Sequence, residues 1–193
     1  MIETIIKTFS IDGTLLGVAA QIIGFIGAFT YFLVFQMKKR SSILAINILA
    51  GMIFVVHFSL IGAYTGAAMN VVCALRCTIY YFSDRKWAKS KAWLAVFIGV
   101  SVVLGVLTWG DIYSVFPLMA MVITSISFWL KKESHIRLLT LPTQPGWMIY
   151  NIHNNSISGL LTDIVIFSSI LIAIIRYDII KKQKPQAVKQ NEA

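Results

Sequence analysis

The sequence has few charged residues, which make up 13% of its 193 residues, about half the share found in an ordinary soluble domain. Acids are the scarcer kind, because only 8 residues are Asp or Glu, and 58% of the chain is apolar. This shortage of charge excludes an ordinary soluble domain. We therefore expect an integral membrane protein, with the lipid bilayer as its solvent and its main partner.

Cysteines and catalytic motifs are also scarce. Cys73 and Cys77 lie four residues apart on one helix face, which suits neither a disulfide nor a complete metal site, so we interpret them as small packing residues. The sequence has no glycine-rich nucleotide loop, no paired metal ligands and no nucleophile elbow. These absences predict that the protein is not an enzyme and holds no metal and no cofactor.

Long apolar runs occupy most of the chain. A membrane-spanning helix needs about 17–25 mostly apolar residues, and short polar segments divide the sequence into seven such runs. Residues 1–14 are expected to form an interfacial segment and residues 181–193 a disordered basic tail, on either side of one membrane domain, 15–180. The predicted spans are 17–37, 43–62, 66–82, 92–109, 113–130, 138–152 and 159–180.

Almost all of the 17 basic residues fall on one side of the membrane if the chain crosses it seven times. They gather in residues 38–40, 85–91, 131–137 and 176–189. Positively charged loops stay in the cytoplasm, so we expect the amino terminus outside and the carboxyl terminus inside. The net charge of +9 thus reflects membrane topology, and no nucleic-acid partner is expected.

A shift of 93 residues aligns the second half of the chain with the first. It superimposes the basic loop 38–43 on 131–136 and Gly66 on Gly159, and the predicted helix ends then agree throughout. An odd linker helix, 92–109, would make the second triple of helices, 113–180, parallel to the first, 17–82. The predicted fold is therefore all-α, with seven transmembrane helices in a 3+1+3 arrangement and any solute site between the two repeats.

Two runs carry a family resemblance. Residues 55–76, VVHFSLIGAYTGAAMNVVCALR, and residues 147–159, WMIYNIHNNSISG, resemble the YgjV family of bacterial inner-membrane proteins. That family pairs a His-Phe and Gly-x-Tyr segment with an Asn and an Arg on the next span, and repeats a Trp-x-Ile-x-Asn segment in its second half. The resemblance implies a multi-pass protein of the bacterial inner membrane.

The repeat also resembles, more distantly, the SWEET, PQ-loop and PnuC architecture of small-solute carriers. In SWEET-like carriers a bulky residue on the second helix of each bundle and an Asn on the third helix flank the substrate. Phe54 with Asn70, and Trp147 with Asp163, occupy similar places here, sixteen residues apart in each pair. The resemblance implies a small polar solute between these residues, although Phe and Asp depart from the SWEET pattern.

Charged side chains inside a span are costly, so each one needs a partner or a function. Arg76 follows Gly66 by ten residues, about 15 Å along a helix, which places it near mid-membrane. It either holds an anionic solute, pairs with Asp163 or locks helices together. Asp163 aligns with Asn70; either it takes a proton or cation while Asn70 binds the solute, or both complement a helix dipole.

The sixth span is interrupted by Pro142 and Pro145, which remove backbone donors and break or kink a helix. Gln144, Trp147 and Asn151 would share one face of this broken span. Such a stripe can stack on and hydrogen-bond a ring-shaped solute, or it can hydrogen-bond neighbouring helices. Broken spans beside a cavity are where transporters place their sites.

His57 is a second candidate, with Asp163, for proton coupling, and its alternative is a packing residue whose ring nitrogens are satisfied. Two functions remain open, and a homo-oligomer is compatible with both. The first is a small-solute carrier, which needs a cavity that reaches one face of the membrane. The second is a sensor or assembly protein that transports nothing, in which Arg76 and Asp163 would only lock helices in a dry interface.

Overall fold

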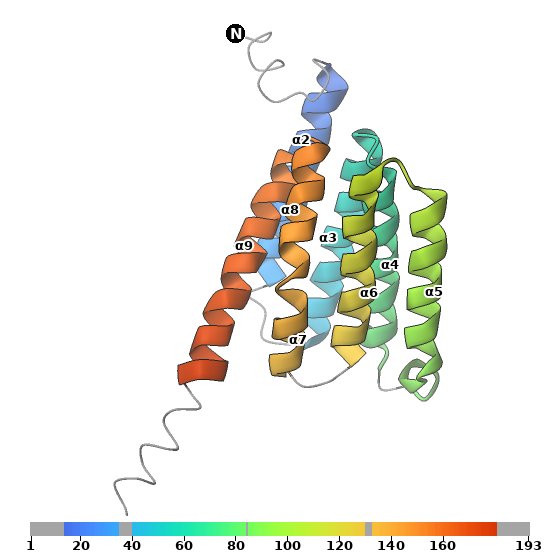
Figure 1. Ribbon diagram of the computed structural model, residues 1–193, viewed down its shortest axis with the longest axis vertical. Helices are drawn as coiled ribbons and strands as arrows, with labels where there is room; N and C mark the ends of the chain where they lie inside the picture. Colours follow the sequence, from blue (N-terminus) through green and yellow to red (C-terminus); the bar gives the residue numbers. More distant parts are fainter. Residues whose placement is uncertain (1–13, 35–39, 84, 130–132, 181–193) are drawn as a thin grey trace, which may run out of the picture.

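The computed structural model describes residues 14–34, 40–83, 85–129 and 133–180. These residues form helices joined by short turns, and no strand is present among them, as the all-α prediction expects (Figure 1). The predicted tail and nearly all of the predicted interfacial segment lie outside the described residues.

Among the described residues, each predicted span contains helical structure. The sixth span is two helices, α7 and α8, which meet at a turn over Leu141 and Pro142, so the predicted proline break is confirmed. Pro145 is the third residue of α8, where its missing N–H removes no helical hydrogen bond. The helices are α2 (Leu15–Val34), α3 (Arg40–Leu60), α4 (Tyr64–Tyr81), α5 (Ala92–Leu107), α6 (Val115–Trp129), α7 (Glu133–Thr140), α8 (Thr143–His153) and α9 (Ile157–Ala173), which continues as the π-helix η3 (Ile174–Ile180).

Length and composition make three of these segments able to cross a membrane, namely Leu15–Leu33, Ser41–Leu60 and Ile157–Ile179. The segments Ala92–Leu107 and Ile112–Ser127 are apolar as well but shorter. Large apolar side chains cover the outside of the bundle; Phe29, for example, is 63% exposed. An apolar outer surface of this kind is what a lipid bilayer requires.

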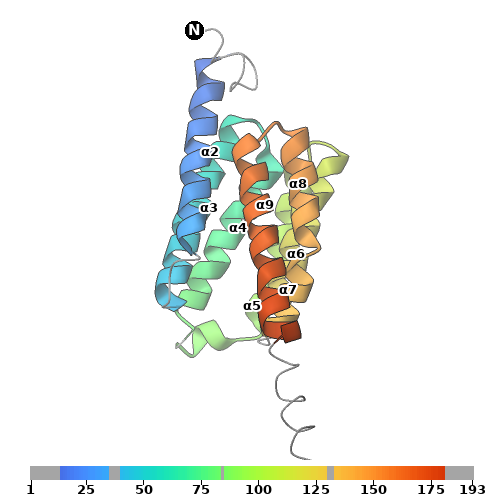
Figure 2. The same ribbon diagram turned by 90° about the vertical axis from the view of Figure 1, so that its left-hand side faces the viewer.

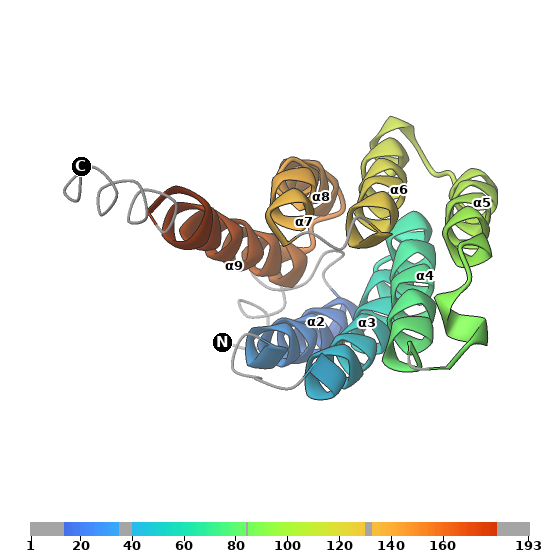
Figure 3. The ribbon, with the colours of Figure 1, turned by 90° about the horizontal axis from the view of Figure 1, so that it is seen from below.

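The helices run side by side along the long axis and turn back at two ends, called here the upper and lower ends as in Figure 1 (Figures 1 and 2). Seen from below, they form two rows, α2–α3–α4 and α6–α8–α9, with α7 below α8 (Figure 3). The rows touch where α2 packs on α9 and where α4 packs on α6, and α5 packs beside α4 and α6. The basic segment 85–91 lies at the lower end, so the upper end is the predicted outer end.

Two apolar clusters fill the space between the helices. The upper cluster consists of Phe54, Phe58, Ala63, Ala67 and Tyr150. The lower cluster consists of Met69, Val72, Phe97 and Met121. Trp147 packs against both clusters, which places this aromatic residue in the middle of the bundle.

The turns that join α3 to α4 and α8 to α9 have the same backbone structure. Each has one residue with positive φ, Gly62 at 74° and Asn155 at 52°, and these two residues are 93 positions apart. In each turn the next amide bonds back to a helix carbonyl, Ala63 to Phe58 and Ser156 to Asn151, both at 2.8 Å. The two turns therefore correspond to each other, residue by residue, at the predicted offset of 93 residues.

Candidate functional site

His57 connects α3 to α2 and to the start of α9. Its side chain is fully buried, Nδ1 lies 2.7 Å from the carbonyl oxygen of Ala20, and Nε2 lies 2.7 Å from Ser156 Oγ. A carbonyl only accepts, so Nδ1 carries the hydrogen, and in the neutral ring Nε2 then accepts from the Ser156 hydroxyl. Ser156 Oγ in turn accepts from the amide of Gly159 at 3.2 Å and caps α9. These contacts are those of the packing alternative for His57.

Tyr150 makes the corresponding connection in the opposite direction, from α8 to the start of α4. Its hydroxyl accepts a hydrogen bond from the amide of Gly66 at 2.9 Å, and its side chain is 2% exposed. The alignment by 93 residues pairs Tyr150 with His57 and Gly66 with Gly159. Each row of helices thus reaches across to the start of the last helix of the other row.

A second matched pair of contacts lies at the same level. Gln21 on α2 donates to the carbonyl of Asn155 at 2.7 Å, and its Oε1 lies 3.5 Å from the hydroxyl of Ser158. On the other side, Thr65 Oγ1 lies 3.1 Å from Ser114 Oγ. Ser114 stands 93 residues after Gln21, and Ser158 stands 93 residues after Thr65. Hydrogen bonds therefore join the two rows on both sides of the upper end.

The two predicted aromatic residues, Phe54 and Trp147, lie around one central ring, that of Phe58. Phe54 is 3% exposed and its ring centroid is 5.7 Å from that of Phe58. Trp147 stacks on Phe58, with the two ring centroids 6.1 Å apart, and meets the Tyr150 ring edge-on at 6.0 Å. The structure thus brings both predicted aromatic residues to the boundary between the rows.

The predicted polar residues do not all meet. Asn151 Nδ2 donates to Asp163 Oδ2 at 2.7 Å, and the two side chains are 1% and 7% exposed. Asn70, in contrast, donates to the carbonyl of Gly66 in its own helix at 2.9 Å. Gln144 is buried beside Thr143, and its Oε1 has no partner among the described residues. The sequence thus identified Asn151 and Asp163 without predicting that they bind each other.

Arg76 is buried between α4 and α6. Its guanidinium donates to the hydroxyls of Thr124 at 3.0 Å and Ser125 at 3.1 Å, and one nitrogen lies 3.7 Å from Cys73 Sγ. Pairing with Asp163 was one of the alternatives for Arg76, and no ion pair joins these two side chains in the described part of the chain. The hydroxyls of α6 take the place of the carboxylate and connect one row to the other.

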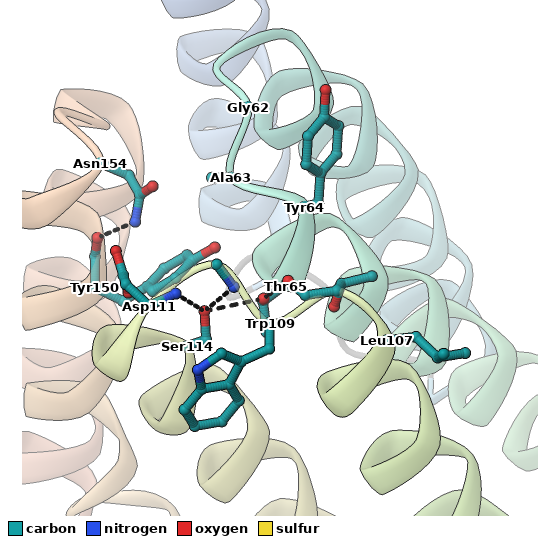
Figure 4. A pocket seen from close by; sticks show the side chains of 12 residues that line it. Gly62, Ala63, Tyr64, Thr65, Leu107, Trp109, Asp111, Ser114, Tyr150 and Asn154 are labelled. Atoms are coloured by element: carbon teal, nitrogen blue, oxygen red, sulfur yellow. Dashed lines mark hydrogen bonds between the residues drawn. The ribbon is translucent and has the colours of Figure 1, made fainter.

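Two cavities lie beside these contacts. The upper cavity, about 390 Å³, opens between the turn after α3, the turn after α5 and the end of α8 (Figure 4). Tyr64, Trp109, Asp111, Ser114 and Tyr150 are among the residues that line it (Figure 4). The second cavity is a groove of about 250 Å³ between the lower half of α2 and α9, and its lining is mostly apolar. Neither lining includes a predicted solute-binding residue.

Residues 18–181 match the Imp-YgjV family, whose description is bacterial inner membrane protein. The chain belongs to this family. The match contains both runs, 55–76 and 147–159, on which the family resemblance was predicted. Comparison with curated proteins and with solved structures gave no match. Membership of Imp-YgjV makes the chain a bacterial inner-membrane protein that works in a lipid bilayer.

Some residues that form the row-to-row contacts carry little signal in the sequence of this Imp-YgjV protein. Gln21, Thr65, Ser114 and Ser158 are single polar residues in or beside apolar runs, and such residues are common in membrane helices. The 93-residue alignment held a usable signal, because it pairs Gln21 with Ser114 and Thr65 with Ser158. Polar residues at both members of an aligned pair mark these four positions, but the alignment does not show which of them are in contact.

Proposed function

We propose that this Imp-YgjV protein is a small-solute carrier of the inner membrane, in which seven spans form two parallel three-helix repeats. The main observation behind the proposal is that contacts between the rows come in matched pairs: each residue of one contact stands 93 positions from a residue of the other. The pairs Gln21–Ser158 and Thr65–Ser114 are matched in this way. A common backbone turn and a common cross-connection to the next helix accompany them.

The packing order of the helices supports the same arrangement. In two rows related by an axis along the membrane normal, the first helix of each row must meet the last helix of the other. The contacts of α2 with α9 and of α6 with α4 satisfy this requirement. The helix α5 packs beside α4 and α6 without being part of either row, as a linker between repeats should.

In this proposal the solute binds between the rows near Phe54, Asn70, Trp147, Asn151 and Asp163. The hydrogen-bonded pairs at the upper end would close the periplasmic side above this site. The groove between α2 and α9 lies below those pairs and would belong to a path from the cytoplasmic side. Carriers alternate between two such states by moving one repeat against the other.

A sensor or assembly protein is the second candidate, and one observation favours it. The buried Asn151 and Asp163 side chains bind each other, and none of the predicted solute residues lines either cavity. In this alternative the upper pairs would be permanent locks between helices. The two candidates therefore differ in whether the residues between the rows ever reach water.

Labelling of an engineered cysteine separates the two candidates. We would replace Cys73 and Cys77 by Ser, introduce Asn70→Cys, and treat intact cells and inverted membrane vesicles with a membrane-impermeant maleimide. The carrier predicts labelling in inverted vesicles, and additional labelling from the periplasm when Gln21→Ala and Thr65→Ala open the upper end. Failure to label from either side in both backgrounds would favour the sensor or assembly alternative.

Two exposed positions serve as controls for sidedness. Ile112→Cys, 69% exposed and next to Asp111 of the upper cavity, should label only in intact cells. Lys89→Cys, exposed at the lower end, should label only in inverted vesicles. Reversal of both controls would place the amino terminus in the cytoplasm and contradict the predicted orientation.

A further inference from the structure

The buried pair of Asn151 and Asp163 has too few hydrogen-bond donors for its oxygen atoms. Asn151 Nδ2 donates to Asp163 Oδ2, and this hydrogen bond joins α8 to α9. Asn151 Oδ1 is buried and has no hydrogen-bond partner among the described residues. Buried carbonyl oxygens nearly always have a donor, because leaving one without a partner costs stability.

Gly159 closes the space beside the unpartnered oxygen. A Cβ added to Gly159 would lie 2.4 Å from Asn151 Oδ1, which is closer than real Cβ contacts allow. The α-hydrogen of glycine occupies this direction and offers only a weak C–H···O interaction. The Ser156 hydroxyl lies on this same side, 2.6 Å from the added Cβ, but its hydrogen goes to His57 Nε2. Asp163, which already accepts from the amide, is therefore the neighbour left to supply a strong donor.

We infer that Asp163 holds a proton and that the Asn151–Asp163 pair is a proton-binding site between α8 and α9. A neutral carboxylic acid and a primary amide form two hydrogen bonds together, N–H to one carboxyl oxygen and O–H to the amide oxygen. Protonation therefore supplies the missing donor and removes a buried negative charge. That this proton is the coupling ion rests on the proposed carrier function.

The titratable groups of the surrounding elements have other partners. His57 of α3 binds Ala20 and Ser156, and Tyr150 of α8 binds Gly66. Tyr31 of α2 lines the groove between α2 and α9, and its ring packs against Phe54. The remaining groups are Arg76 of α4, bonded to α6; His153 of α8, paired with Asp111; and Arg176 and Asp178 of η3, more than three helical turns beyond Asp163. Among the described residues, no cation forms an ion pair with Asp163.

Infrared spectroscopy of the purified full-length protein tests the inference directly. A protonated carboxyl group has a C=O stretching band that is separate from the bands of carboxylates. At neutral pH this band should be present in the unmodified protein and absent in Asp163→Asn, which keeps the size and the neutral form of the side chain. Asp178→Asn is the matched control, because Asp178 forms a bidentate ion pair with Arg137 and should contribute no such band.

A second variant keeps the test sharp. Asn151→Leu removes the hydrogen-bond acceptor, so the band should remain but move to the higher frequency of a carboxyl group without this bond. Absence of the band at neutral pH would overturn the inference. Loss of the band on replacing choline by Na⁺ would also overturn it, because a metal cation would then occupy the site.

The infrared and labelling results can fail separately. A carboxyl band without access at Asn70→Cys would retain the proton site and reject the carrier. Access without the band would retain the carrier and reject the proton. Both results together would make a proton the coupling ion to test first, by measuring whether solute uptake responds to a pH gradient.

Discussion

The turns before α4 and α9 have one backbone structure but achieve it with different side chains. The α4 turn has Ala63 where the α9 turn has Ser156, so it lacks a hydroxyl that could cap the helix. The long side chain of Tyr150 reaches the amide of Gly66 directly, whereas the shorter His57 contacts the Ser156 hydroxyl that caps Gly159. Both helices thus begin with an amide that has a side-chain hydrogen-bond acceptor, but the acceptor is a tyrosine hydroxyl in α4 and a serine hydroxyl in α9.

The surroundings of the two helix-start glycines also differ. Atoms of Phe58 and Tyr150 rings lie closest to Gly66, whereas the oxygens of Asn151 and Ser156 lie closest to Gly159. Phe58 and Asn151 are themselves 93 residues apart. One turn is thus packed in an apolar way and the other in a polar way, so the buried carboxyl group and its amide partner belong to the second half alone.

Replacing the two glycines should produce the largest effects. A Cβ at position 159 would lie 2.4 Å from Asn151 Oδ1, and a Cβ at position 66 would lie 2.8 Å from a carbon of the Tyr150 ring. We expect Gly159→Ala to lower the free energy of unfolding by about 3 kcal/mol and Gly66→Ala by about 2 kcal/mol, as for other overpacked sites. Denaturation in detergent, followed by fluorescence of the tryptophans, measures both.

Gly99→Ala is the matched control for these substitutions. Gly99 lies within α5, and a Cβ there would have no neighbour within 4 Å. Alanine is the better helix former, so this variant should be neutral or more stable by up to about 1 kcal/mol. Equal behaviour of Gly159→Ala and Gly99→Ala would show that the close approach to Asn151 does not exist.

The difference between the caps predicts an asymmetric response to their removal. Tyr150→Phe removes one acceptor, that of the Gly66 amide, and should cost about 1 kcal/mol. Ser156→Ala leaves both the Gly159 amide and His57 Nε2 without their partner, and should cost about 2 kcal/mol. The same unfolding measurement ranks the two variants, and a larger loss for Tyr150→Phe would contradict the cap geometry.

The missing hydroxyl can be added back to sharpen this comparison. Ala63→Ser places a serine at the position equivalent to Ser156, four residues before Ala67 as Ser156 precedes Leu160. In the Tyr150→Phe background this serine should cap α4 and restore roughly half of the lost stability. In the unmodified protein the amide already has its acceptor, so Ala63→Ser should bring no gain. A gain in the unmodified protein would mean that Tyr150 does not cap α4.

The sequence predicted the features that depend on chain order. The positions of the helices and the break at Pro142 follow from apolar lengths and proline chemistry, and the structure has helices and a break there. The 93-residue alignment pairs Gly66 with Gly159, and the turns before these two glycines share one hydrogen-bond pattern. The family resemblance from residues 55–76 and 147–159 was also confirmed. These features are local or follow from aligning the chain with itself. They do not depend on how each helix is rotated about its own axis.

Side-chain partners depended on helix rotation and were not predicted. Membrane helices are apolar on all faces, so the spacing of apolar residues does not show which face is inside. Arg76 was considered with Asp163 because both are charged, yet it binds Thr124 and Ser125 on the neighbouring α6. Two hydroxyls at the right rotation accept hydrogen bonds from the guanidinium, and nothing in an apolar run marks them in advance.

The smallest expected effects concern the positive-φ residues of the two turns. Gly62 has φ of 74° and no atom near its missing Cβ, so Gly62→Ala should cost only the backbone strain, about 1 kcal/mol. Asn155 has φ of 52°, and Asn155→Gly should change stability by less than about 0.5 kcal/mol.

The most informative variant is Gly62→Asn, which gives the first turn the residue of the second. Since asparagine tolerates this conformation better than alanine, Gly62→Asn should unfold closer to the unmodified protein than Gly62→Ala does. If the two variants were equally destabilised, the first turn would need glycine for a reason other than φ, and its equivalence with the second turn would be limited to the hydrogen bonds.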